Sequence, residues 1–524
     1  MRTAAYLLIV ILTALRLYWL RYFCGIDLAP DEAHYWDWAR HLDLSYYSKG
    51  PLVAWVIRGS LETLGDSVFA VRFPAAIFGG LLLLGLHTLA RLILVDHPRR
   101  EALALMVVAF AATLPAVGAG SLLMTIDSPF VCLWTWALVA GWLAIRSDRS
   151  AWWLLTGALV GLGILAKYTM ALWPFSLAVL FVMSPGWRAR LWSRGFLLMT
   201  ATAFVGCLPI LIWNVHNDFV TFQHVAVQAG TKSAGFRPFG PLEYIGGQMA
   251  ILIGYWFICW VAAMLRMRPR RDTPDGIRYL WWMSLPTFLV FGTASLRAAG
   301  QINWPVSAYL SGMVLAAIWV DSQINHPSKG WRNLCRGILA FALLLGIGMN
   351  LLMHDTTPVR PLMATLAGEP TAENPFPIRR FDPSCRLRGW KYLASEVDRV
   401  RDEVRRTEGG EAVVSGLNWM MPGELGFYCQ GHPTVYTLGP RMGDRHSQYD
   451  LWHPNPIDEP EAFLGKTFVF VGFGEPMLER AFGEVLKPRR VEYSEDGRPI
   501  AAWLIWVCRD FRGFPKEVGP DRKY

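Results

Sequence analysis

Apolar runs long enough to cross a membrane recur along the first 353 of the 524 residues. A membrane helix needs about 20 mostly apolar residues, and by that rule the chain has about eleven spans. They are expected near residues 4–23, 68–95, 102–120, 128–146, 151–166, 168–184, 196–213, 243–265, 279–296, 303–320 and 336–353. The fifth and sixth are short, and the intervening AKYT predicts a tilt or a break. The pattern predicts a polytopic α-helical membrane protein.

The loops between these runs differ in charge. Arginine and lysine gather in alternate loops, at residues 99–100, 146–149, 188–194, 266–278 and 329–336. Basic loops face the cytoplasm, so the N-terminus is predicted to be cytoplasmic. The loops 24–67, 121–127, 214–242 and 297–302 are then predicted to lie outside. No small-residue cleavage site follows the first run, which favours a retained anchor over a signal peptide.

The pattern changes after residue 353. A Pro-rich linker leads into the polar helix LRGWKYLASEVDRVRDEVRRT, which is followed by the β-branched runs EAVVSG, TVYTLG, TFVFVGFG and AAWLIWVC. Strands that alternate with helices predict a small α/β domain over residues 354–524, outside the membrane. The segment VGFGEP lacks the third glycine of a dinucleotide loop and predicts a plain strand-to-helix turn. One disulfide among Cys385, Cys429 and Cys508 is compatible with that compartment, without a readable pairing.

Composition supports the membrane assignment. Hydrophobic residues make up 53% of the chain and charged residues 17%, against about 25% charged in soluble domains. Most of the net charge of +9 lies in the basic loops, which indicates topology and gives no support to nucleic-acid binding. The eight cysteines are scattered without a C-x-x-C motif, so neither a metal nor a redox cofactor is expected.

The first outer loop is unusually rich in ionisable and aromatic residues, as DEAHYWDWARHLDLSYYSKGPLVAW over residues 31–55 shows. The letters DEAH occur in the ATPase box of helicases, which also need a phosphate-binding loop of the form G-x-x-x-x-G-K-[ST]. The nearest candidate ends at Gly465-Lys466-Thr467, and Pro460 stands where the first glycine is required. A helicase is therefore rejected.

Asp31 and Glu32 follow Pro30, and two interpretations of them remain open. Asp31 would cap a helix with Glu32 in its first turn, or the pair would act chemically, as ionisable residues at a membrane often do. In a helix over residues 31–43, Asp31 shares a face with His34, Tyr35 and Trp38. An amphipathic helix at the membrane surface gives much the same pattern.

Other ionisable residues on the outer side carry the same double interpretation. Lys49 precedes Gly-Pro on a predicted turn. It is interpreted either as a lysine that reaches the lipid surface or as a cation that binds a phosphate. Asp127 in TIDSPF suits an N-cap with proline in the first turn, or a functional carboxylate. Single cations on this side are more typical of lipid-surface anchors; they are Arg72, Lys167, Lys232, Arg237 and Arg297. His216 and His224 are too few for a metal site.

As a set, these stretches resemble the GT-C superfamily of membrane glycosyltransferases, and most of all the bacterial branch related to protein O-mannosyltransferases and lipid A aminoarabinose transferases. The matching stretches lie within residues 1–320: the loop DEAHYWDWARHLDLSYYSKGPLVAW, then GDSVFAVRFPAAIFG, TIDSPF, GILAKYT and GQINWPVSAYLSG. In the tail, RLRGWKYLASEV and RHSQYDLW are similar to a subgroup of these proteins, without a known role. His34-Tyr35 stands where aminoarabinose transferases have Arg-Tyr, and Lys49-Gly50-Pro51 where they have Lys-Pro-Pro. These departures put the sugar and the acceptor in question.

The resemblance implies transfer of a sugar from a polyprenyl phosphate to a hydroxyl of an envelope lipid, a glycan or a protein. The reaction would take place at the periplasmic face of the bacterial inner membrane, without a cofactor. A carboxylate suits the general base and fixed cations suit the leaving phosphate. The expected catalytic residues are Asp31, Glu32 and Asp127, and the expected substrate-binding residues are Lys49, Arg297, His34, Tyr35, Arg72 and Lys167. An aromatic rim of Tyr35, Trp36, Trp38, Tyr46 and Tyr47 is expected at the interface or against the sugar ring.

A transporter or flippase of lipid-linked sugars is the main alternative. Such proteins place charges at mid-membrane in broken helices and often contain inverted repeats. Here the charges gather at one face and no repeat is visible, which favours the transferase. A membrane-tethered receptor is a third class, and it would not need the carboxylates of the outer loops.

Overall fold

The computed structural model describes residues 1–228 and 235–515. Contacts divide the chain into two compact units. The helical unit comprises residues 1–23, 49–56 and 72–354. The sheet unit comprises residues 24–48, 57–71 and the chain after residue 354. The sheet unit thus combines most of the first outer loop with the tail.

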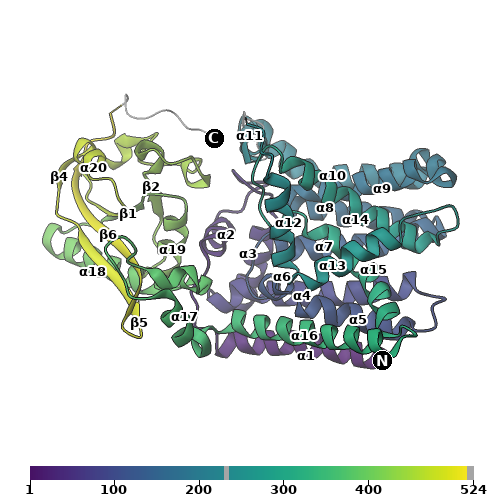
Figure 1. Cartoon of the computed structure of the whole chain (residues 1–524). Helices are drawn as coiled ribbons and strands as arrows, with labels where there is room; N and C mark the ends of the chain where they lie inside the picture. Colours follow the sequence, from purple (N-terminus) through teal and green to yellow (C-terminus); the bar gives the residue numbers. More distant parts are fainter. Residues whose placement is uncertain (229–234, 516–524) are drawn as a thin grey trace. The chain divides into compact units, whose positions relative to one another are not determined.

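Helices occupy every predicted span of the helical unit (Figure 1). They are α1 (Arg2–Tyr22), α4 (Val68–Ile93), α5 (Arg100–Thr113), α6 (Pro115–Gly120), α7 (Asp127–Ser147), α8 (Ser150–Ala166), α9 (Leu172–Met183), α10 (Arg194–His216), α12 (Gly240–Ile251), α13 (Tyr255–Arg266), α14 (Asp275–Ala294), α15 (Val306–Ile324) and α16 (Lys329–His354). A further helix, α11 (Val220–Gln228), lies in the predicted loop 214–242. Five described helices are individually long and apolar enough to cross a membrane: α1, α4, α7, α10 and α16. The prediction of a multi-pass helical membrane protein is confirmed.

Several predicted spans are broken. The predicted break at AKYT is confirmed, because α8 ends at Ala166 and Lys167 is extended, with φ −151° and ψ 127°. The span predicted over residues 102–120 divides at Leu114, which is held extended by the following Pro115. The span predicted over residues 243–265 is bent, since α12 and α13 meet at 113°.

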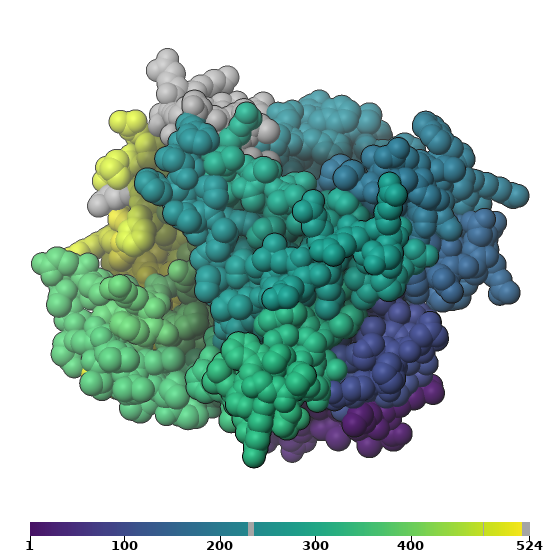
Figure 2. Space-filling view, turned by 45° about the vertical axis from the view of Figure 1, so that its right-hand side comes forward, coloured from purple at the N-terminus to yellow at the C-terminus, as the bar shows by residue number. Residues whose placement is uncertain are grey.

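Close packing and satisfied polar groups hold the helical unit together. A Cβ on Gly161 of α8 would lie 3.0 Å from the Cα of Gly206 in α10, so these helices cross almost backbone to backbone. The buried hydroxyl of Tyr279 donates to the Leu138 carbonyl at 2.9 Å. The helices α1 and α16 lie side by side (Figures 1 and 2), and Trp19 meets His354 edge to face at 5.0 Å.

The sheet unit contains a mixed sheet of six strands in the order β2-β1-β3-β6-β4, with β5 paired to β6. The strands are β1 (Val413–Gly416), β2 (Val435–Thr437), β3 (Phe468–Val471), β4 (Phe482–Val485), β5 (Arg489–Glu495) and β6 (Arg498–Phe511). Strand β1 is parallel to β2 and β3, whereas β6 is antiparallel to β3, β4 and β5. The polar helix α18 (Trp390–Glu408) buries its apolar stripe in a cluster with sheet residues such as Val414 and Val469. The predicted α/β content of the tail is present.

The structure also bears on two smaller predictions for the tail. The segment VGFGEP is a strand-to-helix turn, between β3 and α20 (Glu475–Ala481), as predicted. Cys385, Cys429 and Cys508 are separate buried thiols, so the structure contains no disulfide between them.

The first outer loop belongs to the core of the sheet unit. Its helix α2 (Pro30–Arg40) packs on α19 (Met420–Tyr428), and a Cβ on Gly423 would lie 2.6 Å from the backbone carbon of Ala33. Asp27 accepts a 2.9 Å hydrogen bond from the backbone N–H of Trp390, the first residue of α18. The carboxylates of α2 are therefore positioned by contacts with residues almost 400 positions later in the chain.

Candidate active site

A partly buried ion pair joins two segments of the helical unit, the start of α7 and the residue after α8. Lys167 donates from Nζ to Asp127 Oδ1 at 2.6 Å, and Asn303 donates from Nδ2 to Asp127 Oδ2 at 2.7 Å. The Lys167 ammonium also lies 5.4 Å from the centroid of the Phe130 ring. The break after α8 is what places Lys167 here, since a continued helix would direct it differently. Both carboxylate oxygens of Asp127 accept a hydrogen bond.

The capping interpretation of Asp127 is wrong. The helix α7 begins at Asp127 itself, Ile126 occupies the N-cap position, and no side chain caps this end. The backbone N–H of Asp127 donates to Thr125 Oγ1 at 3.3 Å. The Asp127 carboxylate is therefore directed to Lys167 and Asn303. Asn303 was not identified from the sequence, although it lies within the matching stretch GQINWPVSAYLSG.

The turn that carries Lys49 packs against the same break. Lys49 lies in a bend before α3 (Leu52–Leu64) and is half-buried. A Cβ on the neighbouring Gly50 would lie 2.2 Å from the carbonyl oxygen of Leu165, two residues before Lys167. Only glycine fits this contact, so the predicted turn is present and is held close to the Asp127–Lys167 pair.

A cavity of about 330 Å³ adjoins this pair. Its wall is mostly apolar, with Leu82, Val117 and Leu310 among its residues, and it includes Asp127 and Asn303. Such a mostly apolar wall suits an apolar group, and its few polar residues can orient that group.

The two carboxylates at the start of α2 have different surroundings. Ala29 is the N-cap and Pro30 begins the helix, so the prediction of Asp31 as the N-cap is wrong. Glu32 is fully buried, and its Oε2 accepts the backbone N–H of Ala29 at 2.9 Å, which stabilises the helix start. Asp31 is exposed, and the Tyr35 hydroxyl donates to its Oδ1 at 3.4 Å. Of the pair, Asp31 is the exposed carboxylate and Glu32 the buried one.

His34 lies in an aromatic cage of the sheet unit. Its ring centroid is 4.7 Å from Trp38, 4.9 Å from Tyr449 and 5.5 Å from Trp419. Nδ1 is 3.3 Å from the Trp419 carbonyl oxygen, the geometry of a donated N–H. Burial lowers the pKa of His34 to about 3, and the nearby Arg445 charge lowers it further. His34 is therefore neutral at physiological pH and supplies no positive charge.

The predicted aromatic rim is not exposed. Tyr35, Trp36, Trp38, Tyr46 and Tyr47 are all buried. Trp38 stacks on Tyr46 at 4.2 Å, and Trp36 donates its indole N–H to Asp66 at 2.8 Å. These rings pack the interior of the sheet unit and do not form the rim expected at the interface or against the sugar ring.

The other predicted cations are in different environments. Arg72 in α4 is completely buried. Arg297 follows α14 and is exposed. Lys232 lies outside the described residues. Among the described residues no group of three or more His, Cys, Asp or Glu side chains is arranged to hold a metal.

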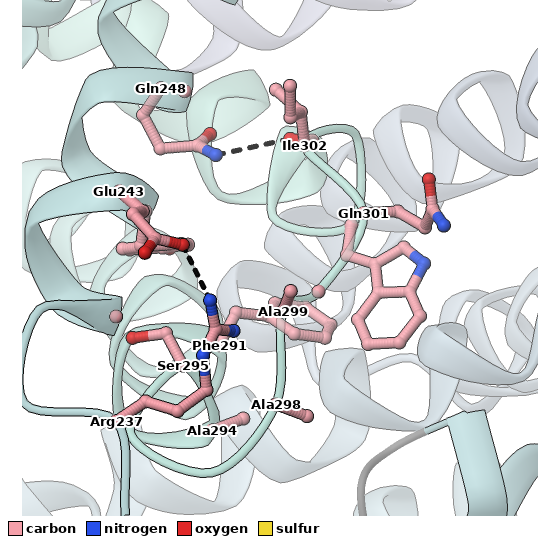
Figure 3. Close-up of a pocket in the computed structure, with 15 residues that line it drawn as sticks. Arg237, Glu243, Gln248, Phe291, Ala294, Ser295, Ala298, Ala299, Gln301 and Ile302 are labelled. Carbon is pink, nitrogen blue, oxygen red and sulfur yellow. Dashed lines mark hydrogen bonds and ion pairs between the residues drawn. The ribbon is translucent and has the colours of Figure 1, made fainter.

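Arg237 lines a second cavity of about 250 Å³ in the helical unit (Figure 3). Its Nη2 lies 2.7 Å from Glu243 Oε2, so a carboxylate neutralises this cation. Gln248 donates to the carbonyl of Ile302 at 3.1 Å and accepts from the Tyr309 hydroxyl at 3.0 Å. Part of the cavity wall is therefore polar and held by hydrogen bonds, and one of these bonds involves Ile302, the residue before Asn303.

Comparison with known proteins supports the same chemistry. The family described as dolichyl-phosphate-mannose-protein mannosyltransferase matches residues 48–213. The chain is 32% identical over 305 residues to lipid A galacturonosyltransferase RgtD of Rhizobium johnstonii, with 57% of this chain and 61% of the relative covered. It is 25% identical over 374 residues to the undecaprenyl phosphate-alpha-4-amino-4-deoxy-L-arabinose arabinosyl transferase of Pseudomonas savastanoi pv. phaseolicola, with 64% and 66% covered. The matched part spans slightly less than two thirds of each relative.

The fold also matches a solved structure over nearly the whole chain. The crystal structure of ArnT from Cupriavidus metallidurans bound to undecaprenyl phosphate superimposes with a TM-score of 0.60 at 16% identity, covering 99% of this chain and all of that one. Its apo form gives a TM-score of 0.59. The matches agree with the resemblance seen in the sequence: the chain is similar to lipid-A-modifying transferases and, over residues 48–213, to a mannosyltransferase family.

Proposed function

We propose that the protein is an integral-membrane glycosyltransferase that moves a sugar from a polyprenyl phosphate to a hydroxyl of an envelope lipid or glycan. The observation that carries this proposal is the Asp127–Lys167 pair at the wall of an apolar cavity. Charged groups near a membrane are costly and are kept where function requires them. The names of the relatives support a lipid-linked donor and a lipid or glycan acceptor; they give no support to a protein acceptor.

Asp31 is proposed as the general base. It is the exposed carboxylate of α2, whereas Glu32 is engaged at the helix start. In the proposed step the acceptor oxygen forms a bond to the anomeric carbon, and the bond from that carbon to the phosphate oxygen breaks. Asp31 takes the hydroxyl proton, and the polyprenyl phosphate leaves with the electron pair. A positioned base of this kind contributes about 10²–10⁴ in rate.

Lys49 and Arg297 are proposed to stabilise the leaving phosphate, and Lys167 to support them. Fixed cations act most strongly where water is excluded, and Lys49 lies on a turn braced against the α8 break. Both oxygens of Asp127 accept hydrogen bonds, so Asp127 is proposed to position Lys167 and not to take a proton. His34, Tyr35 and Arg72 are proposed to shape the substrate site. The apolar cavity is proposed to receive the first part of the polyprenyl chain.

The membrane arrangement belongs to this proposal. We propose about eleven spans, with the N-terminus in the cytoplasm and residues 354–524 in the periplasm, in the bacterial inner membrane. The basic loops support this orientation, because arginine and lysine are retained on the cytoplasmic side. Asp31, Lys49 and Asp127 then all belong to segments on the periplasmic side.

Mass spectrometry of envelope lipids tests the function directly. Deletion of the gene should remove a sugar from one envelope lipid or glycan, and the wild-type gene should restore it. The Lys49→Ala protein should reach the membrane at a normal level without restoring the sugar, because the phosphate loses a charge-assisted contact. Envelope lipids that are identical with and without the gene would contradict the proposal.

A further inference from the structure

The segment Arg445–Trp452, with the sequence RHSQYDLW, is built into the sheet unit by buried hydrogen bonds. Asp450 accepts from the backbone N–H of Ser447 at 2.6 Å and from the Thr437 hydroxyl at 2.7 Å. Gln448 accepts the backbone N–H of Tyr47 at 2.7 Å, in buried surroundings. These bonds tie the segment both to β2 and to the first outer loop. These buried hydrogen bonds hold the segment in one position.

This scaffold presents the guanidinium of Arg445. The guanidinium lies 5.7 Å from the ring centroid of Trp419, and both side chains are half-buried. Asp444 next to it accepts the backbone N–H of Arg445 at 2.8 Å. Among the described residues, the Arg445 guanidinium makes no ion pair. A fixed arginine that lies over an aromatic ring keeps its N–H groups available in one plane, which suits a bidentate carboxylate.

Arg445 lies beside Trp419, which in turn contacts His34 of α2. The Trp419 carbonyl holds Nδ1 of His34, and the charge of Arg445 acts on the His34 ring. His34 is also the position at which the sequence departs from the Arg-Tyr of aminoarabinose transferases. The positive charge at this place therefore comes from Arg445, on a different segment. Trp419, which is half-buried, adds ring surface suited to a sugar.

We propose that Arg445, held over Trp419 beside His34, binds the carboxylate of an acidic sugar that the enzyme transfers. This inference rests on the proposed function and names the class of sugar, a hexuronic acid. The same anionic chemistry is available from a phosphate on the acceptor lipid, and the test separates the two sources. The segment RHSQYDLW then has a role as the support of a specificity residue.

The test compares two donors on the purified full-length protein in nanodiscs. Both carry the same polyprenyl phosphate, one linked to a hexuronic acid and the other to the corresponding neutral hexose. Loss of one charged hydrogen-bonding partner reduces affinity about 10–100-fold. Arg445→Gln should therefore lower kcat/KM for the uronyl donor by that factor relative to the hexosyl donor, and Arg445→Lys should recover part of it. Arg399→Gln is the matched control, because Arg399 is an exposed arginine of α18 paired with Glu396.

The remaining outcomes decide against the inference. An equal loss for both donors that persists with a dephosphorylated acceptor lipid, or no loss at all, would mean that Arg445 has only a structural role or none. A loss that disappears when the acceptor lipid is dephosphorylated would assign Arg445 to the acceptor phosphate, and the carboxylate assignment would be wrong. Transfer of the neutral hexose alone by the wild type would leave the proposed function intact and reject the acidic sugar. Transfer from neither donor, together with envelope lipids that are unchanged by deletion of the gene, would reject the proposed function itself.

Discussion

Lys167 Nζ lies 2.6 Å from Asp127 Oδ1, although the two residues are 40 positions apart. Their side chains are 8% and 24% exposed, so water screens the pair only in part. The contact depends on the end of α8 at Ala166, since the extended backbone of Lys167 directs the side chain to the start of α7. Asn303 completes the arrangement from a third segment. Three outer segments thus meet at one carboxylate.

Asp127→Asn and Lys167→Met should not be additive. Each single change leaves a buried partner without its counter-charge, and the double variant leaves none. We expect an interaction free energy of about 1–3 kcal/mol in thermal unfolding of the purified protein, and a similar coupling in kcat/KM. Additive effects within about 0.5 kcal/mol would show that the pair has no energetic connection and would remove the positioning role of Asp127.

Gly50→Ala should damage the Lys49 turn. The new Cβ would lie 2.2 Å from the Leu165 carbonyl oxygen, and relief of such a contact costs about 1–3 kcal/mol. We expect a lower melting temperature and a loss of donor use that resembles that of Lys49→Ala. Gly59→Ala is the control, because nothing lies within 4 Å of its Cβ position. Equal behaviour of the two alanine variants would show that the turn does not need its contact with α8.

The neutral state of His34 should make stability depend on pH. Its pKa is lowered from 6.5 to about 3 by burial, so the unfolded chain takes up the proton first as the pH falls. The contribution of neutral His34 to the free energy of unfolding is complete above pH 6.5 and decreases progressively towards pH 3. At pH 5 about 2 kcal/mol of it is lost. Between pH 7.5 and 5, the melting temperature of the wild type should therefore fall more than that of His34→Gln.

Asp37 contributes with the opposite sign in part of the same range. Burial raises its pKa to about 6, against the opposing effects of Arg40 and His41. Its contribution to stability therefore decreases as the pH rises through about 6. It is present in both proteins, so the difference between wild type and His34→Gln isolates His34. Parallel pH profiles of the two proteins would contradict a buried, neutral His34.

The order of helices and the break at Lys167 could be predicted from the sequence because both follow from local pattern. Apolar length gives the spans, and AKYT interrupts a run of helix formers. The role of Asn303 could not be predicted, because its partner is 176 residues away and an amide in a loop has no periodic signal. The aromatic rim was wrong for a related reason: composition shows that rings gather near the membrane, but not that α19 covers them. The placement of Asp31 outside the N-cap depended on Pro30, which takes the first helical position.

Reporter fusions test the orientation. Fusions at residue 190, in a basic loop, and at residue 400, in α18, should report opposite sides of the membrane, because arginine and lysine are retained in the cytoplasm. Signals from the same side would contradict the topology.

Sugar transfer by the Asp31→Asn protein tests the central claim most directly. Purified wild-type and variant proteins would be placed in vesicles with a radiolabelled polyprenyl-phosphate sugar and an envelope lipid acceptor. Asparagine keeps the size and shape of the side chain and removes its ability to take a proton. The account predicts that the wild type moves label onto the acceptor, and that the variant folds and inserts normally but transfers about 10²–10⁴ times more slowly. Near-normal transfer by the variant would contradict Asp31 as the base, and movement of intact donor across the bilayer without transfer would contradict the transferase itself.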